Sequence, residues 1–201
     1  GSRNFGTLSQ RKRDMMAEVA ATLAFSTIAN NDKVGVIFFS DKIEKYIPAQ
    51  KGKTHVLHII RELLSFEPTS KGTDMAQALQ YFANAQKRHC TAFLISDFIG
   101  TGAVDKPLLI ASNRHEVNAI QIYDRREAEL PNIGLVKFHD AESNSNLWID
   151  TSLATIRNNY AQAWKQNQDS LEQLFTRTGV KHVSVRTDED YVKALMHLFR
   201  C

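Results

Sequence analysis

A continuous run of mostly apolar residues, CTAFLISD at 90–97, constrains the fold of this chain more than any other feature. Such a run is typical of a strand that is covered on both faces. Similar runs lie at 33–41 (KVGVIFFSD) and 115–124 (HEVNAIQIYD), and amphipathic stretches of helical length separate them. Strands that alternate with helices predict an α/β fold, in which a mostly parallel sheet carries helices on both faces.

The remaining segments continue this alternation. The hydrophobic spacing predicts helices over 8–29, 54–66, 74–87, 106–113, 153–178 and 188–199, and a further strand over 181–187. The segment 42–49 alternates apolar and polar residues but contains Pro48, which has no backbone N–H, so we expect an edge strand. GLVKFHD and NLWID, joined by the polar AESNS, predict an additional β-hairpin over 134–150.

Composition limits the expected number of domains, the class of partner and the cellular location. Its 201 residues, 43% of them hydrophobic, suffice for one buried core, and no linker or repeat interrupts them, so we expect a single domain over 1–201. The net charge of +3 is small and spread out, which argues against a nucleic-acid partner. Cys90 and Cys201 build no disulfide framework, which predicts a reduced, cytoplasmic location. No apolar run reaches the ~20 residues of a membrane span, so no membrane contact is expected for this fragment.

Chemistry-bearing residues gather at one edge of the predicted sheet. Asp41, Asp97 and Asp124 each follow a predicted strand, and Thr73 lies in a loop that enters a helix. Ligands of open α/β sheets bind at the carboxyl ends of the strands. Hydroxyl and carboxylate oxygens there suit a hard cation such as Mg²⁺. Taken singly, each residue has a simpler interpretation, because an Asp at a strand end is often a turn or cap residue, and Thr73 or Asp74 could be a helix N-cap.

Two motifs resemble a known metal site. KGTDMAQAL and FLISDF are similar to the second and third parts of the metal-ion-dependent adhesion site of von Willebrand factor A domains. More closely, DKVGVIFFSDKIEKYIPAQ, LISDF, WIDTS and above all RHEVNAIQIYDRREAELP resemble the bacterial domain of unknown function 58 family, from about residue 4 to the C-terminus. That resemblance implies a von Willebrand factor A-like, Rossmann-like fold. It also implies an association with MoxR-type AAA ATPases, beside which such proteins are often encoded.

The resemblance also implies roles for individual residues. Thr73 would bind the ion through its hydroxyl, and Asp97 would hold an ion-bound water. Ser2 matches the last serine of the family's Asp-x-Ser-x-Ser motif, although a leading Gly-Ser is also what an expression tag leaves. The Asp and the first Ser of that motif, and the first central strand, are missing. We therefore expect an N-terminally truncated domain with an incomplete Mg²⁺ site.

The missing strand has a structural consequence. In the family fold it would lie between the strands over 33–41 and 90–97, whose free edges would otherwise expose unpaired backbone groups. We expect either that these two strands pair directly, or that a second copy of the chain fills the gap and forms a strand-exchanged homo-oligomer.

Two classes of function remain open. The first is a non-enzymatic protein-interaction module, whose ion leaves a coordination position for a carboxylate of a partner protein, a MoxR-type AAA ATPase by resemblance. The second is a Mg²⁺-dependent phosphoryl-transfer enzyme or nuclease that uses Asp41, Asp97 and Asp124. The first is favoured because no histidine falls at a predicted strand end to act as a base. Cys90 follows His89, but a small buried hydrophobe is expected there rather than a nucleophile.

Overall fold

Strand β4 (Glu116–Tyr123) is the centre of the main sheet in the computed structural model, which describes residues 3–70, 72–100, 102–139 and 146–200. It pairs in parallel with β3 (Thr91–Ser96) on one side and with β7 (Lys181–Arg186) on the other. Every residue from 117 to 122 is buried. This burial on both faces explains the uninterrupted apolar pattern of the sequence.

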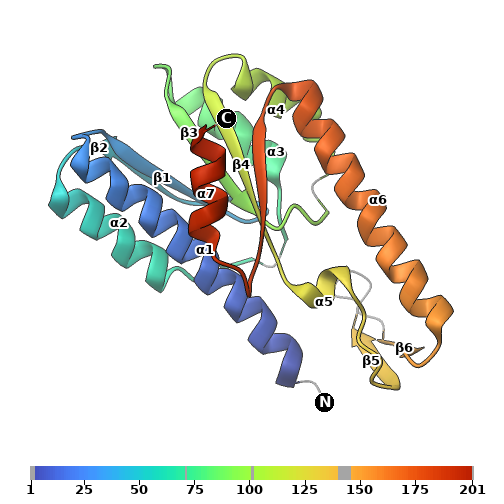
Figure 1. Cartoon of the computed structure of the whole chain (residues 1–201). Coiled ribbons are helices and arrows are strands. Elements are labelled where there is room, and N and C mark those ends of the chain that lie inside the picture. The colour runs from blue at the N-terminus through green and yellow to red at the C-terminus, as the bar shows by residue number, and fades with distance from the viewer. Residues whose placement is uncertain (1–2, 71, 101, 140–145, 201) are drawn as a thin grey trace.

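Helices cover both faces of this sheet (Figure 1). Val117 and Ala119 of β4 contribute to a core with α3 (Met75–Ala85), α4 (Asp105–Ser112) and α6 (Ala154–Thr178). Ile120 and Ile122 contribute to the opposite core, which α1 (Arg3–Ala29) and α7 (Tyr191–Arg200) complete. The expected α/β architecture, with a parallel sheet between two helical layers, is confirmed.

A separate antiparallel hairpin lies beside the main sheet. It consists of β1 (Val34–Phe39) and β2 (Ile43–Gln50), and α1 and α2 (Lys53–Ser65) pack on it. Its core contains Phe38, Ile47, Val56 and Ile59, all at most 6% exposed. In Figure 1 this hairpin occupies the side of the molecule away from α6.

Strands β1 and β3 belong to different sheets. Among the described residues, β1 pairs only with β2, and β3 pairs only with β4. Of the two alternatives expected for these strands, direct pairing is therefore wrong. Each keeps one edge whose backbone groups have no ladder partner in the described part of the chain.

A second hairpin projects near the N-terminal end of α6 (Figure 1). Strands β5 (Leu135–His139) and β6 (Asn146–Asp150) pair antiparallel, with Leu135 opposite Asp150. This confirms the hairpin predicted over 134–150, except for its turn at 140–145, which lies outside the described residues. The short helix α5 (Arg125–Ala128), between β4 and this hairpin, was not predicted.

Gly35 of β1 provides a test of the first hairpin. A Cβ atom at this position would lie 2.7 Å from the Ile47 carbonyl oxygen and 2.8 Å from the Ala49 nitrogen, both backbone atoms. Gly35→Ala should therefore lower the free energy of unfolding by about 1–3 kcal/mol, because the two strands must separate. Urea unfolding measures this loss. Gln50→Ala, an exposed position in the same hairpin, should change stability little, and equal effects of the two substitutions would contradict the close packing.

The free edges of β1 and β3 lead to a second prediction. Unpaired strand edges add strands from other chains. The protein should therefore associate with itself as its concentration rises, which sedimentation velocity would detect. A species that stays monomeric at every accessible concentration would count against strand exchange.

Candidate functional site

The turn after β3 fixes the position of Asp97. Phe98, the next residue, has a φ of +54°, a left-handed conformation that costs roughly 1–2 kcal/mol in a residue other than glycine. Its ring is 2% exposed and packs edge-on against Phe175, with centroids 5.3 Å apart. Burying a phenylalanine contributes roughly 1.5–3 kcal/mol, so the burial offsets the strained turn. The result is a chain that turns sharply inward immediately after Asp97.

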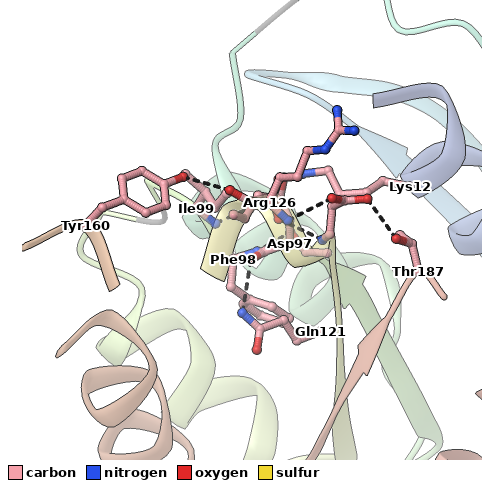
Figure 2. Close-up of polar contacts among 11 residues, drawn as sticks. Lys12, Asp97, Phe98, Ile99, Gln121, Arg126, Tyr160 and Thr187 are labelled. Atoms are coloured by element: carbon pink, nitrogen blue, oxygen red, sulfur yellow. Dashed lines mark hydrogen bonds and ion pairs between the residues drawn. The ribbon is translucent and has the colours of Figure 1, made fainter. Parts of the chain in front are cut away.

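The carboxylate of Asp97 is held from two sides (Figure 2). One oxygen accepts a hydrogen bond from Lys12 at 2.8 Å, and the other accepts from the Ile99 backbone N–H at 3.2 Å. Gln121 donates to the Asp97 backbone carbonyl at 3.3 Å and accepts from the Ser184 hydroxyl at 2.8 Å. Side-chain bonds thus tie the end of β3 to β4 and β7, although the Asp97 side chain stays 32% exposed.

Lys12 reaches this edge from α1. Its ammonium lies 2.8 Å from an Asp97 oxygen and 2.5 Å from an oxygen of Glu127 on α5, while its side chain is only 14% exposed. Burial alone would lower the pKa of Lys12, but the two carboxylates outweigh that effect and raise it above its usual value. Lys12 is therefore a charged ammonium shared by two carboxylates.

Asp124, at the end of β4, caps a helix. It is 7% exposed, and its oxygens accept from the Arg126 backbone N–H and the Thr187 hydroxyl, both at 2.9 Å. Glu127 completes a capping box by accepting from the Asp124 N–H at 3.1 Å. Both Asp124 oxygens are thus engaged within the fold, which corresponds to the simpler of the two roles considered for a strand-end Asp.

Thr73 lies at the carboxyl end of β1. The Asp74 N–H donates to the Ser40 carbonyl at 2.8 Å, which ties the loop of Thr73 to the end of that strand. Asp74 is the N-cap of α3 and accepts from the Gln77 N–H at 2.9 Å, so the cap is Asp74 rather than Thr73. Thr73 itself is exposed.

The expected ligands stand at the ends of different strands. The loop of Thr73 is bonded to the end of β1, whereas Asp97 directly follows β3. The described hydrogen bonds of the Asp97 carboxylate go to Lys12 and Ile99. Ser2 lies outside the described residues. Asp41 lies beside Gly72, which belongs to the loop of Thr73. It accepts a hydrogen bond from the Ser40 hydroxyl at 3.2 Å.

The described residues fit Mg²⁺ in donor type but supply few donors. A hydroxyl and a carboxylate are hard oxygen ligands, as this ion prefers, yet its octahedral shell needs about six oxygens. Within the described part of the chain, no three His, Cys, Asp or Glu side chains form a group that could hold a metal. The Lys12 ammonium already provides a positive charge at Asp97.

A second polar group beside β1 was not predicted. The Ser40 hydroxyl donates to Glu44 at 2.7 Å, and the Thr69 hydroxyl and backbone N–H donate to the same carboxylate. These hydrogen bonds, that of Ser40 first, lower the pKa of Glu44. Ser40 and Glu44 lie four positions apart in the first hairpin, whereas Thr69 lies 25 positions beyond Glu44, so no local sequence motif identifies the whole group.

A Cys–His contact lies at the opposite, amino edge of the sheet. The Cys90 sulfur is 3.6 Å from Nδ1 of His115, which is 3% exposed and packs against Phe82 in a tilted arrangement with ring centroids 4.7 Å apart. Burial raises the pKa of Cys90, and burial, then the charges of His89 and Arg114, lowers the pKa of His115. Both shifts favour a neutral thiol beside a neutral imidazole, the opposite of an activated nucleophile.

An apolar groove of about 600 Å³ lies between the second hairpin and α6. Trp148, 61% exposed, lines it together with Leu153 and Ile156. Trp164 lies elsewhere on α6 and packs on Tyr123 with ring centroids 5.3 Å apart.

A family model described as "Protein of unknown function DUF58" matches residues 1–170. An uncharacterized protein of Mycobacterium tuberculosis H37Rv is 30% identical over 195 residues, covering 95% of this chain and 61% of that relative. An uncharacterized protein of Mycobacterium avium is 28% identical over 158 residues, covering 77% of this chain and 92% of that protein. The chain thus spans 61% of the length of the first of these relatives.

Two solved structures share the fold. A conserved hypothetical protein BatB from Bacteroides thetaiotaomicron has a TM-score of 0.51 at 16% identity. An aerotolerance-related membrane protein from Bacteroides fragilis has a TM-score of 0.55 at 15% identity. Both alignments cover 92% of this chain and 86% of the other chain.

The second of these structures corrects one expectation. A cytoplasmic location was predicted from the sequence, and this prediction is wrong, because a structural neighbour is named as a membrane protein. Among the described residues, no helix combines the length and the apolar character needed to cross a bilayer.

The environment of His115 predicts an acid-sensitive fold. Its pKa is lowered in the folded chain, so on acidification the unfolded chain takes up this proton first, near pH 6.5. Above that pH His115 is neutral in both states and does not affect the free energy of unfolding. Below that pH the free energy of unfolding should decrease progressively. Denaturant unfolding from neutral pH to about pH 5 measures this loss, and His115→Phe should reduce it. The exposed His58→Gln is the control, and an unchanged pH profile for His115→Phe would contradict the prediction.

Proposed function

The chain belongs to the DUF58 family, a family of unknown function, and from that premise we propose that it is a non-enzymatic protein-interaction module. Its proposed contact surface comprises Asp97, at the carboxyl end of β3, and Thr73, beside the carboxyl end of β1. The finer fold assignment within this proposal is von Willebrand factor A-like, because that resemblance joins Thr73 and Asp97 in one adhesion-type site. The two solved neighbours support only the shared α/β fold.

The arrangement of Asp97 carries the proposal. The carboxylate is aimed by a strained, buried turn and fixed by two hydrogen bonds, yet it remains one-third exposed. A carboxylate held at a surface in this way suits recognition, since it costs little reorganisation on binding.

The histidines of the main sheet lie away from Asp97. His115 precedes the first residue of β4, and His182 is the second residue of β7. The alternative, a Mg²⁺-dependent phosphoryl-transfer enzyme or nuclease, needs Asp41, Asp97 and Asp124 as ligands. Asp124 is buried, with both oxygens engaged inside the fold, which weighs against that alternative.

The proposal includes a divalent ion that would bridge this chain and a carboxylate of the partner protein. Thr73 would contribute its hydroxyl, Asp97 would hold a bound water, and Ser2 would contribute a second hydroxyl. An ion there would supply a coordination position for a carboxylate of the partner. The proposed partner is a MoxR-type AAA ATPase, on the family resemblance.

Binding to such an ATPase from the same organism tests the proposal. Biolayer interferometry should detect binding in Mg²⁺ that a chelator abolishes. Thr73→Val and Asp97→Asn should each weaken it by about tenfold or more, since each removes one polar contact. Thr91→Val is the matched control, because that hydroxyl lies at the far edge and bonds Glu116.

Two results would overturn the proposal. One is binding that neither substitution nor chelation alters. The other is Mg²⁺-dependent phosphatase or nuclease turnover that Asp97→Asn abolishes, which would favour the enzyme.

A further inference from the structure

Arg126 differs from the other cations around the ends of β3, β4 and β7. Lys12, Arg125 and Arg186 each form an ion pair with a carboxylate. In the described part of the chain, no ion pair or hydrogen bond reaches the Arg126 guanidinium, and no dashed line ends on it in Figure 2. Arg126 is exposed, so its charge is accessible to an anion of another molecule.

The backbone of Arg126 is fixed on both sides. Its N–H donates to Asp124 at 2.9 Å, and its carbonyl accepts from the Tyr160 hydroxyl of α6 at 3.2 Å. Only the side chain has to be ordered when an anion binds, which keeps the entropic cost of binding small. A guanidinium is a planar set of donors that can bind a carboxylate through two parallel hydrogen bonds. Arg126 therefore suits the recognition of a carboxylate.

The apolar groove of about 600 Å³ adjoins the backbone of Arg126. Tyr160, which bonds the Arg126 carbonyl, lines the groove, and so does Leu130, four positions after Arg126. Trp148 and Leu153, 61% and 52% exposed, belong to the same lining. Exposed apolar side chains that gather in a concave site are typical of a surface that binds a partner.

Asp150 places a negative charge in the lining of the groove. Hydrogen bonds from Ser152, first that of its hydroxyl and then that of its backbone N–H, lower the pKa of Asp150. A carboxylate of a ligand would be repelled by Asp150 inside the groove but attracted by Arg126 outside it. The same negative charge disfavours the anionic surface of a lipid bilayer. The occupant that fits is a peptide segment with an apolar side chain in the groove and an acidic side chain at Arg126.

We propose that Arg126 and the groove together bind a segment of a partner protein in which an acidic residue lies close to a large apolar residue. The carboxylate pairs with Arg126, and the apolar side chain packs against Trp148 and Leu153. This inference rests on the proposed function in one respect, because it assumes that the chain is a protein-interaction module. It requires no ion at Asp97.

A phage-displayed dodecapeptide library, selected on the 201-residue chain in the presence of a chelator, tests the inference. The selected peptides should carry Asp or Glu within a few residues of Leu, Phe or Trp. Fluorescence anisotropy then measures the affinity of one selected peptide. Arg126→Gln should weaken this affinity by roughly fivefold, because an exposed ion pair is lost. Arg125→Gln is the matched control, since it removes the same charge from the adjacent residue, which already pairs with Glu129.

A second pair of variants tests the groove. Leu153→Ser should weaken peptide binding by about tenfold, because an apolar contact with the ligand is lost. Leu64→Ser is the control, since Leu64 is an exposed leucine of α2. Helix α2 packs on the first hairpin, on the side of the molecule away from α6 (Figure 1).

A further measurement leaves the groove unchanged. Trp148 and Trp164 are the two tryptophans of the chain, so Trp148 is the only source of tryptophan fluorescence in Trp164→Phe. Peptide binding should shift this emission to shorter wavelength and reduce its quenching by acrylamide, since the ligand covers the exposed ring. This readout keeps the inference testable if Leu153→Ser fails to fold, which circular dichroism would reveal.

Several results would overturn the inference. They are a selection that enriches no acidic and apolar peptides, equal peptide affinities in Arg126→Gln and Arg125→Gln, and Trp148 emission that the peptide does not alter. Binding to vesicles of phosphatidylcholine and phosphatidylglycerol that Leu153→Ser abolishes, with no peptide selected, would assign the groove to a membrane surface instead.

Failure of the proposed function is distinguishable from failure of this inference. Binding of the ATPase that neither chelation, Thr73→Val nor Asp97→Asn alters would overturn the proposed function. Peptide binding is measured without divalent ions and without the ATPase, so it would support this inference even then. ATPase binding that depends on Asp97, together with a selection that yields no acidic and apolar peptides, would overturn this inference alone.

Discussion

Strand β4 is buried on both faces, and most of the molecule is arranged around that constraint. One set of its apolar side chains requires α3, α4 and α6, and the other set requires α1 and α7. The strand also contains a buried amide, Gln121, and an unpaired amide in a core would be costly. Gln121 is satisfied by the Asp97 carbonyl on β3 and by Ser184 on β7. The same strand therefore organises the core and fixes the edge at which Asp97 lies.

The structure at this edge combines strain with charge pairing. Phe98 holds a left-handed backbone because its ring is buried, and that turn directs the neighbouring carboxylate toward α1. Lys12 then neutralises Asp97 and Glu127 together, which links α1, the end of β3 and α5. Removing one member would leave a charge partly buried without its partner, which usually costs more than the pair contributes.

The elements that could be predicted from the sequence are those with local signals. Continuous apolar runs identified β3 and β4, the alternation around AESNS identified the second hairpin, and Asp74 was one of two candidates for the cap of α3. Helix α5 was missed although its Asp-x-x-Glu capping box was visible in the sequence. Lys12 could not have been found, because its partners are distant in sequence and its own helix has no motif around it. The left-handed turn at Phe98 was equally hidden, since tertiary burial, and not residue type, sets it.

The division of strands between two sheets bears on how the molecule comes apart. The β1–β2 hairpin shares no ladder with β3 in the described residues and is joined to the rest through side chains of α1, α2 and α3. Side-chain contacts transmit cooperativity less rigidly than a continuous ladder, so we expect the hairpin to open separately from the parallel sheet. Local opening of the hairpin can then expose its amides to solvent exchange while β3, β4 and β7 stay folded. The loop of Thr73, hydrogen-bonded to Ser40, belongs to the first unit, whereas Asp97 belongs to the second. The proposed contact surface thus spans the boundary between the hairpin and the parallel sheet.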